Sequence, residues 1–379
     1  MRLFALDFQA TVAKLGLMGG RPVKQSPDQK AVFASAAEER PAPRLEPKGL
    51  YRRIPLQPQM MIDRVTRTED FFTLVHLGVP HLSAEDWRLA VEGLVLKPLS
   101  LTLADIAAMP QRSVTAVHQC AGNPLEPTVP TRRVANVAWK GVPLASFLEA
   151  VRALPQARYL WSCGADYGEF AGFSCESYAK DAPLDRLIAA GAILATHLNG
   201  EPLQRENGYP VRLVVPGWYG TNSVKWLSRM TLAEQRLDAV FTTQFYQDRT
   251  PNGEVRPVWD IPVDSILVAP GPNAGLEPGK PFDIWGWAWA ARGVNRVEIS
   301  LNGGENWMPA QVEPASGPAW QRFSLTVPTA GPGPTVRLIA RAQSADGHWQ
   351  PMTGARNAVH VVDITLAQGA AISKEGSKP

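Results

Sequence analysis

Cys120 is the residue whose type and setting best fit a chemical role. It lies in the run His118-Gln-Cys-Ala-Gly-Asn123, after the strand-like run Arg112-Ser-Val-Thr-Ala-Val117 and before a proline-rich loop. A reactive group at a strand end is held by a rigid element, and the small Ala121-Gly122 pair lets backbone approach a bulky group. A soft thiolate there can bind a transition metal or act as a nucleophile. Because a lone cysteine is more often a small buried hydrophobe, the residues alone leave both interpretations open.

The other two cysteines, Cys163 and Cys175, are expected to be buried thiols without a chemical role. Three cysteines without a CxxC or CxxCH pattern argue against a disulfide framework, a structural zinc site and an attached haem. The chain also lacks the GxGxxG fingerprint of flavin or nicotinamide binding. Electrons from a redox reaction here are therefore expected to pass to a separate acceptor.

The composition is typical of a globular, β-rich chain. Hydrophobic residues make up 45% and charged residues 19%, and no apolar run reaches the roughly 18 residues that a membrane span needs. The 34 prolines and 31 glycines suit loops and short strands better than a helical bundle. The net charge of +3 is too small and too dispersed for a nucleic-acid footprint. We expect neither nucleic acid nor membrane as a partner.

The first eight residues show no basic region followed by an apolar stretch, and no twin-arginine signal precedes one. As written, the chain is expected in the cytoplasm. A leader ahead of the given start would instead place it in the periplasm.

The elements that must position Cys120 fall into two predicted domains. Residues 1–50 are rich in Pro, Glu, Lys, Arg and Ala without periodicity and predict a disordered arm. Residues 51–247 alternate short apolar strands, such as 212–216, with helical stretches, such as 143–153 and 184–190, which predicts a mixed α+β domain.

A different pattern begins after residue 247. Turn chemistry over 247–257 predicts a linker. Residues 258–367 contain short alternating runs separated by Gly, Pro and Asn turns, which predict an all-β immunoglobulin-like sandwich with a scaffolding or assembly role. Residues 368–379 are small and polar and predict a frayed tail.

Several segments, in order, resemble the sulfite oxidase family of molybdopterin-dependent oxidoreductases. The likeness covers roughly residues 60–365 and includes a pterin-binding stretch and an immunoglobulin-like dimerisation domain. It rests on Gln119-Cys-Ala-Gly-Asn123, Val134-Ala-Asn-Val-Ala-Trp-Lys-Gly-Val-Pro-Leu144, Tyr178-Ala-Lys-Asp-Ala-Pro-Leu184, Leu198-Asn-Gly-Glu-Pro-Leu203, Gly208-Tyr-Pro-Val-Arg212, Val215-Pro-Gly-Trp-Tyr-Gly-Thr-Asn-Ser-Val-Lys-Trp-Leu227, Ile261-Pro-Val-Asp-Ser-Ile266, Asn302-Gly-Gly-Glu-Asn-Trp307 and Trp320-Gln-Arg-Phe323. One such motif would be weak, whereas the ordered set is specific.

The resemblance implies a mononuclear molybdenum held by the dithiolene of one pyranopterin and by Cys120, the predicted metal ligand. Sulfur donors on both sides suit a metal that passes between Mo(VI) and Mo(IV). Cys120 and Tyr178 are the implied catalytic residues, the phenol being a donor to a developing oxyanion. The implied cofactor-binding residues are Phe72, Val75, His76, Cys120, Asp166, Asn207, Arg212, Ser223, Val224 and Lys225. The resemblance places Trp139 in the substrate pocket and, with a one-residue shift, Arg322; His118 stands where the family commonly has an apolar residue and is a further candidate for this pocket.

The sequence departs from the family where the substrate should bind. Leu74, Pro124 and Leu125 stand where the family usually has arginines, and a further pocket arginine falls at Gln321 or, with a one-residue shift, at Arg322. Each lost charge-assisted contact weakens sulfite binding by about 1.5–3 kcal/mol. Arg132 and Arg133 are the candidates that compensate for this loss.

Three functions therefore stand against one another. The first is oxygen-atom transfer that oxidises sulfite to sulfate, with electrons passed to an external acceptor such as a cytochrome, in a homodimer without haem in this chain. The second is a reductase of S- or N-oxides on the same cofactor. The third is a cofactor-free binding protein of the same fold. Metal content separates the third from the first two, and the direction of turnover separates those two.

Overall fold

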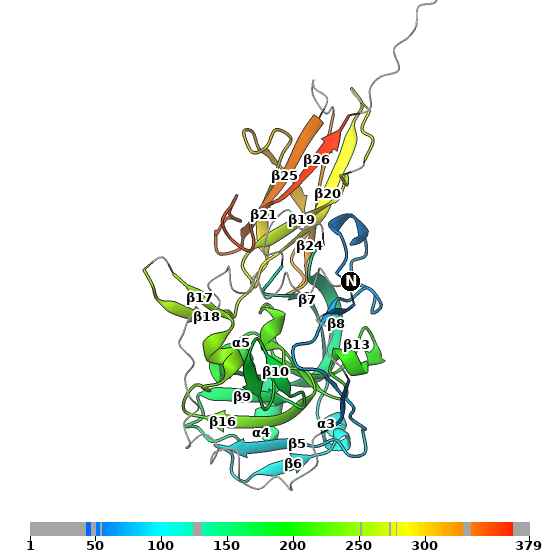
Figure 1. The fold of residues 1–379 in the computed structure, drawn as a ribbon. Helices are drawn as coiled ribbons and strands as arrows, with labels where there is room; N and C mark the ends of the chain where they lie inside the picture. Colours follow the sequence, from blue (N-terminus) through cyan, green and yellow to red (C-terminus); the bar gives the residue numbers. More distant parts are fainter. Residues whose placement is uncertain are drawn as a thin grey trace, which may run out of the picture. The chain divides into compact units, whose positions relative to one another are not determined.

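The computed structural model describes residues 43–46, 51–53, 55–123, 131–250, 252–272, 274–277, 279–328 and 335–366 (Figure 1). They form two compact units. Unit 1 contains the described residues of Met1–Pro55, Val65–Asn123 and Arg133–Ile261, and unit 2 contains those of Leu56–Arg64, Pro124–Arg132 and Pro262–Pro379. No helix among these residues is both long and apolar enough to cross a membrane.

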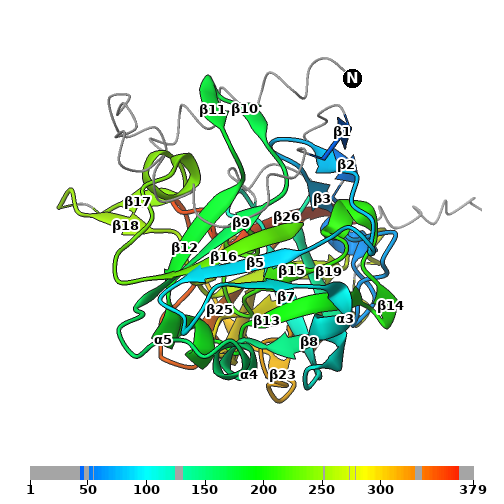
Figure 2. The ribbon, with the colours of Figure 1, turned by 90° about the horizontal axis from the view of Figure 1, so that it is seen from below.

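One five-stranded sheet of unit 1 has the order β12-β9-β16-β5-β6 (Figure 2). Its strands are β12 (Ala179–Pro183), β9 (Tyr159–Gly164), β16 (Leu227–Ala233), β5 (Leu89–Gly93) and β6 (Leu99–Leu101). The β16–β5 pair is parallel, and the other pairs are antiparallel. Tyr178 directly precedes β12, and Asp166 lies two residues after the end of β9. This sheet therefore sets the backbone positions from which both side chains extend.

The second five-stranded sheet carries Cys120 at a strand end. Its order is β14-β13-β8-β7, with β15 paired to β13, and its strands are β14 (Glu201–Pro202), β13 (Ile193–Leu198), β8 (Val134–Pro143), β7 (Arg112–Gln119) and β15 (Arg212–Val214). β8 is buried along nearly its whole length, as a central strand should be. A Cβ on Gly141 would lie 2.0 Å from the Leu194 carbonyl oxygen, so only glycine permits this approach of β8 to β13.

Short helices and hairpins complete unit 1. The helices are α3 (Leu103–Ala108), α4 (Leu144–Ala150), α5 (Leu184–Ala189), the 3-10 turns η2 (Arg205–Asn207) and η3 (Gly220–Asn222), and the π-helix η4 (Val240–Gln244). Two-stranded ladders join β1 (Leu45–Glu46) to β4 (Val79–Pro80), β2 (Tyr51–Arg53) to β3 (Thr73–Leu74), β10 (Gly168–Phe170) to β11 (Phe173–Cys175), and β17 (Gln247–Arg249) to β18 (Val255–Pro257). Phe147 of α4 and Leu187 of α5 pack into the core between these elements, where the apolar helix faces are removed from water.

Unit 2 is a sandwich of two four-stranded antiparallel sheets. One has the order β19-β20-β24-β23, formed by β19 (Asp264–Ala269), β20 (Phe282–Trp289), β24 (Gln321–Val327) and β23 (Gln311–Val312). The other has the order β22-β21-β25-β26, formed by β22 (Met308–Pro309), β21 (Val294–Ser300), β25 (Thr335–Ser344) and β26 (His360–Thr365). Ile284, Val297, Phe323 and Leu338 fill the core between them. The predicted fold class, an α+β domain followed by an all-β immunoglobulin-like sandwich, is confirmed.

Two tryptophans attach the early segment Leu56–Arg64, which includes the 3-10 turn η1 (Pro58–Met60), to unit 2. Trp287 and Trp320 stack with ring centroids 4.8 Å apart. The Trp287 indole N–H donates to the Met61 carbonyl at 2.7 Å, and that of Trp320 donates to the Arg64 carbonyl at 2.9 Å. No pattern in the sequence predicts that Leu56–Arg64 belongs to unit 2, because this depends on packing between residues far apart in the chain.

Two predicted boundaries differ from the structure. The predicted linker 247–257 contains the antiparallel hairpin β17–β18, and the chain stays with unit 1 as far as Ile261. The turn residues of this segment are typical of a linker between domains, whereas in the structure they join the two strands of a hairpin. The predicted arm 1–50 includes β1, which pairs with β4. The rest of that arm up to residue 42, and the predicted tail 368–379, lie outside the described residues.

We predict that Trp320→Phe loosens the segment Leu56–Arg64. The substitution keeps an aromatic ring but removes the indole donor to the Arg64 carbonyl, a change of about 1 kcal/mol that corresponds to several-fold faster local opening. Hydrogen exchange of the peptide that covers 56–64 measures it. Trp349→Phe, at a tryptophan 37% exposed, is the control. Equal exchange in both variants would show that the hydrogen bond does not hold the segment.

Candidate active site

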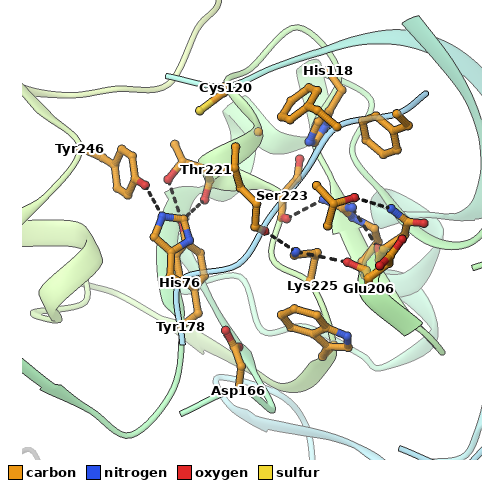
Figure 3. Close-up of a pocket in the computed structure, with 18 residues that line it drawn as sticks. His76, His118, Cys120, Asp166, Tyr178, Glu206, Thr221, Ser223, Lys225 and Tyr246 are labelled. Atoms are coloured by element: carbon orange, nitrogen blue, oxygen red, sulfur yellow. Dashed lines mark hydrogen bonds between the residues drawn. The ribbon is translucent and has the colours of Figure 1, made fainter. Parts of the chain in front are cut away.

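A cavity of about 700 Å³, counted with its open mouth, lies in unit 1 and collects most of the residues singled out from the sequence. Figure 3 shows Cys120 and His118 at one end of it and Asp166 at the other, with Lys225 and Glu206 along one side. The lining residues are Phe71, Phe72, Thr73, Leu74, His76, His118, Cys120, Asp166, Tyr178, Glu206, Asn207, Arg212, Gly220, Thr221, Ser223, Lys225, Trp226 and Tyr246.

Cys120 is partly exposed in the cavity wall, directly after β7. Its backbone N–H donates to the Arg133 carbonyl at 2.9 Å, which extends the β7–β8 pairing by one residue. The Gly122 N–H lies 3.4 Å from its sulfur, and the Arg133 guanidinium donates to the Gly122 carbonyl at 2.9 Å. The thiol is therefore held by backbone on both sides while one face stays accessible, as a metal-binding or reactive cysteine needs.

His118 fills the wall behind Cys120 as a neutral ring. It packs edge-on against Phe71 with centroids 5.3 Å apart, and a Cβ on Gly220 would lie 2.6 Å from its Nε2 atom. Burial lowers the pKa of His118 well below its ordinary value, and the nearby Arg212 and Lys225 lower it further. His118 consequently gives this end of the cavity an aromatic, uncharged face at neutral pH.

Two buried cations line the middle of the cavity. The Arg212 guanidinium donates to the carbonyls of Asn207 and Ser223, each at 3.0 Å, and its carbon lies 4.9 Å from the Trp139 ring centroid. Lys225 donates to the Leu74 carbonyl at 2.7 Å and to the Glu206 carbonyl at 3.3 Å. Within the described part of the chain, neither forms an ion pair with a carboxylate. Burial lowers the pKa of Arg212 to about 9, because removal from water disfavours the charged form.

Three polar atoms around these cations are buried without a hydrogen-bond partner: Asp166 Oδ1, Asn207 Oδ1 and Arg212 Nε. Such atoms are costly unless something binds them. Burial raises the pKa of Asp166 and lowers the pKa of Lys225, so each ionises less readily than usual. Two acceptors and one cationic donor in one cavity fit a ligand that combines N–H groups with an anion.

Two phenols stand on the side opposite Lys225 (Figure 3). The Tyr178 hydroxyl lies 2.8 Å from the Thr221 carbonyl oxygen and 2.7 Å from its Oγ1. The Tyr246 hydroxyl lies 2.6 Å from His76 Nε2. Burial is the main cause that raises the pKa of both phenols, so they stay protonated donors, and burial lowers the pKa of His76 to about 3.

The structure brings together most, but not all, of the residues predicted for the site. Those that line the cavity are Phe72, His76, His118, Cys120, Asp166, Tyr178, Asn207, Arg212, Ser223 and Lys225. Val75 and Val224 are buried but are not among its lining residues, and Trp139 lies behind Arg212. Arg322 belongs to unit 2, where its guanidinium stacks on Trp285 at 4.7 Å. Its role in a substrate pocket stays a prediction.

Several lining residues escaped the sequence analysis. They are Phe71, Thr73, Glu206, Gly220, Thr221, Trp226 and Tyr246. Trp226 is only 1% exposed, as a core residue would be, yet its ring also forms cavity wall, with Lys225 Nζ 4.4 Å from the ring centroid. Of the two arginines after Cys120, Arg133 lies in the loop that holds it, whereas Arg132 belongs to unit 2.

Comparison with known proteins gives consistent matches along the chain. Residues 76–241 match the family described as the oxidoreductase molybdopterin binding domain, and residues 255–368 match the Mo-co oxidoreductase dimerisation domain. Sulfite oxidase of Gallus gallus is 29% identical over 89% of this chain and 79% of its own length. Sulfite oxidase of Arabidopsis thaliana is 28% identical over 84% and 90%. The sulfane dehydrogenase SoxCD of Paracoccus pantotrophus superimposes with a TM-score of 0.70 at 28% identity, over 88% of this chain and 85% of that one.

We predict that inorganic phosphate stabilises the cofactor-free protein through Arg212. An anion beside the uncompensated guanidinium binds the folded state alone, and phosphate at about 100 times its Kd adds about 2.7 kcal/mol. Arg212→Met should abolish the phosphate-dependent rise in Tm, whereas Arg158→Met, at an exposed position, should keep it. An equal rise in both variants would locate the anion elsewhere.

We also predict that Lys180, a buried lysine whose Nζ donates to the Phe241 carbonyl, makes stability depend on pH. Burial lowers its pKa from 10.5 to about 7. Between these values the unfolded chain binds more protons, so the free energy of unfolding rises with pH, by up to about 1.4 kcal/mol per unit.

Lys180→Met should reduce that slope between about pH 7 and 10, measured by chemical denaturation. Lys97→Met, which removes an exposed lysine, gives the background slope. A slope equal to that of the wild type would mean that Lys180 keeps its proton in the folded protein.

Proposed function

This chain belongs to the sulfite oxidase family of molybdopterin-dependent oxidoreductases, and from that premise we propose that it oxidises a small sulfur compound at a molybdenum centre in the cavity of unit 1. Sulfite is the first candidate substrate. One sulfite ion and one water molecule give sulfate, two protons and two electrons, and the electrons pass to a separate acceptor. We propose a homodimer assembled through the domain that spans residues 255–368.

The observation that carries this proposal is that one cavity contains the buried Arg212 without a counter-ion, the Asp166 Oδ1 and Asn207 Oδ1 atoms without hydrogen-bond partners, and Cys120. A molybdenum pyranopterin has the complementary groups, namely a phosphate, pterin N–H donors and a metal that takes one thiolate. Among the described residues, no group of three or more His, Cys, Asp and Glu side chains could hold a metal by themselves. The residues present therefore suit a metal whose other ligands come with the cofactor.

Each residue has a definite task in this arrangement. Arg212 and Lys225 hold the phosphate, and the Asp166 and Asn207 oxygens accept hydrogen bonds from the pterin ring. The Cys120 thiolate is the protein ligand to the metal, which supplies oxygen-atom transfer and accepts two electrons when bound. Burial keeps Tyr178 protonated, and its hydroxyl hydrogen, which is directed to the Thr221 carbonyl at 2.8 Å, would turn to an oxygen that gains charge during the reaction.

A less anionic sulfur compound, such as a sulfane, is a second candidate because of the wall around Cys120. The cavity there is lined by Phe71, Leu74 and the neutral His118. Arg133, the arginine next to the Cys120 loop, donates a hydrogen bond to the Gly122 carbonyl. Fixed positive charges strengthen the binding of a doubly charged substrate, whereas a wall of uncharged side chains contributes little to its affinity. The structurally similar SoxCD is a sulfane dehydrogenase.

Metal analysis and kinetics test the proposal. Purified from a host that makes the cofactor, the wild type should carry about one molybdenum and one pterin per chain and should reduce ferricyanide with sulfite or with methanethiosulfonate, a singly charged compound with a sulfane sulfur. The ratio of the two kcat/KM values distinguishes the substrate candidates. A protein free of molybdenum and pterin would contradict the proposal.

We predict that Cys120→Ser lowers kcat by more than about 100-fold, beyond the loss typical of residues that only support a metal ligand. The Tm should change little, because the side chain is partly exposed and nearly isosteric. Cys175→Ser, at a buried cysteine outside the cavity, is the matched control for the serine substitution. Full activity of Cys120→Ser would refute its role as the ligand.

A further inference from the structure

Tyr246 is a cavity residue that the sequence resemblance did not supply. It follows the π-helix η4 (Val240–Gln244), and its φ of 60° lies in the left-handed region that a non-glycine residue rarely adopts. Both π-helical turns and such backbone strain are concentrated at functional sites, where the surrounding structure maintains them. The strained backbone at Tyr246 therefore calls for an explanation beyond packing.

Several contacts hold the backbone around Tyr246 in place. Lys180, 4% exposed, donates from Nζ to the Phe241 carbonyl inside the π-helix at 2.7 Å and lies 5.3 Å from the centroid of the Tyr246 ring. The Val258 N–H donates to the Tyr246 carbonyl at 3.0 Å, and the Phe245 N–H donates to the Val240 carbonyl at 3.1 Å. The buried Lys180 thus holds the π-helix in place through the Phe241 carbonyl, and the end of this helix sets the direction in which the Tyr246 side chain points.

The Tyr246 hydroxyl points into a small polar group at the Cys120 end of the cavity (Figure 3). His76 Nε2 lies 2.6 Å away, and His76 is itself packed against Tyr178 with ring centroids 5.1 Å apart. Thr221 connects the phenols, because its Oγ1 lies 2.7 Å from the Tyr178 hydroxyl and its hydrogen bond to Tyr246 lowers the pKa of that phenol. The Cys120 charge raises the pKa of both phenols, so both are within its electrostatic range.

We propose that Tyr246 is a second substrate-contacting phenol, which hydrogen-bonds to the oxygen atoms of the sulfur substrate or its product beside Cys120. The proposal rests on the oxidation of a sulfur compound proposed above and deepens it. His76 is the positioning residue: with its proton on Nε2, the neutral ring donates to the Tyr246 oxygen, which leaves the phenol's own hydrogen to donate to an oxygen atom in the cavity. Two phenols in place of arginines would recognise oxygen atoms without requiring a dianion.

Tyr246→Phe tests this in the holoenzyme, because it removes only the hydroxyl. Activity is expressed per bound molybdenum, with the faster of sulfite and methanethiosulfonate. The Kd of sulfate for the oxidised holoenzyme, measured by titration calorimetry, gives a second readout that does not depend on turnover. Tyr167→Phe is the matched control, because the Tyr167 hydroxyl donates to the Pro43 carbonyl at 3.2 Å and does not line the cavity.

We expect Tyr246→Phe to lower kcat/KM by about 10- to 100-fold and to raise the sulfate Kd by at least about tenfold, with molybdenum content unchanged. Tyr167→Phe should match the wild type in both. A Tyr246→Phe enzyme that equals the wild type in kcat/KM and in sulfate binding, even with a lower Tm, would overturn the proposal and leave only a structural hydrogen bond to His76.

The same measurements separate this proposal from the proposed function. A wild type that carries molybdenum but oxidises neither sulfur compound contradicts the proposed function, and Tyr246 is then judged by sulfate binding alone. Weaker sulfate binding by Tyr246→Phe than by the wild type supports the contact. Equal binding, or no binding by the wild type, overturns it.

Discussion

Arg212 carries a guanidinium group into a position that is 3% exposed, where its charge is met by two carbonyl oxygens and an aromatic face instead of a carboxylate. A buried charge without a counter-ion opposes folding, and the lowered pKa of Arg212 expresses that cost. The rest of unit 1 must therefore be stable enough to keep this residue in place. An anionic ligand removes the cost, so ligand binding and stability are coupled at this point.

Residues of the site come from both five-stranded sheets of unit 1. The β7–β8–β13–β15 group supplies Cys120, His118 and Arg212 from strands whose mutual register is fixed by ladder hydrogen bonds. The β12–β9 pair fixes the start of Tyr178 and the turn that bears Asp166. Neither sheet by itself holds a complete set of groups. The chemistry depends on loops at the ends of both sheets, which rigid strands hold at fixed positions.

Strain and close approach occur where the loops meet the cavity. Trp226, next to Lys225, has a φ of 50°, and Tyr246 has a φ of 60°. Gly220 is required where the backbone passes His118 Nε2, because a Cβ there would approach within 2.6 Å. These features destabilise the chain locally and are maintained by the packing around them.

The sequence by itself determined the fold class, the two domain types and most of the residues that line the cavity. Strand alternation and turn spacing are local properties, and motifs such as Gln119-Cys-Ala-Gly-Asn123, through their resemblance to a known family, point to the residues that we propose bind the cofactor. The domain boundaries were harder to predict from the sequence. The hairpin β17–β18 contains the same types of turn residue as a linker. Leu56–Arg64 is held in unit 2 by hydrogen bonds from Trp287 and Trp320, which are far away in the sequence.

Only the tertiary structure decided which charges lack partners and which side chains meet. Burial, and with it the shifted pKa of Arg212, Lys180 and His76, depends on residues far apart in the chain. Tyr246 shows no periodic pattern or motif in the sequence, and it reaches the cavity because a π-helix anchored by Lys180 turns it there. Local patterns encode elements and single residues, whereas the free energy of a buried polar group is set by its whole surroundings.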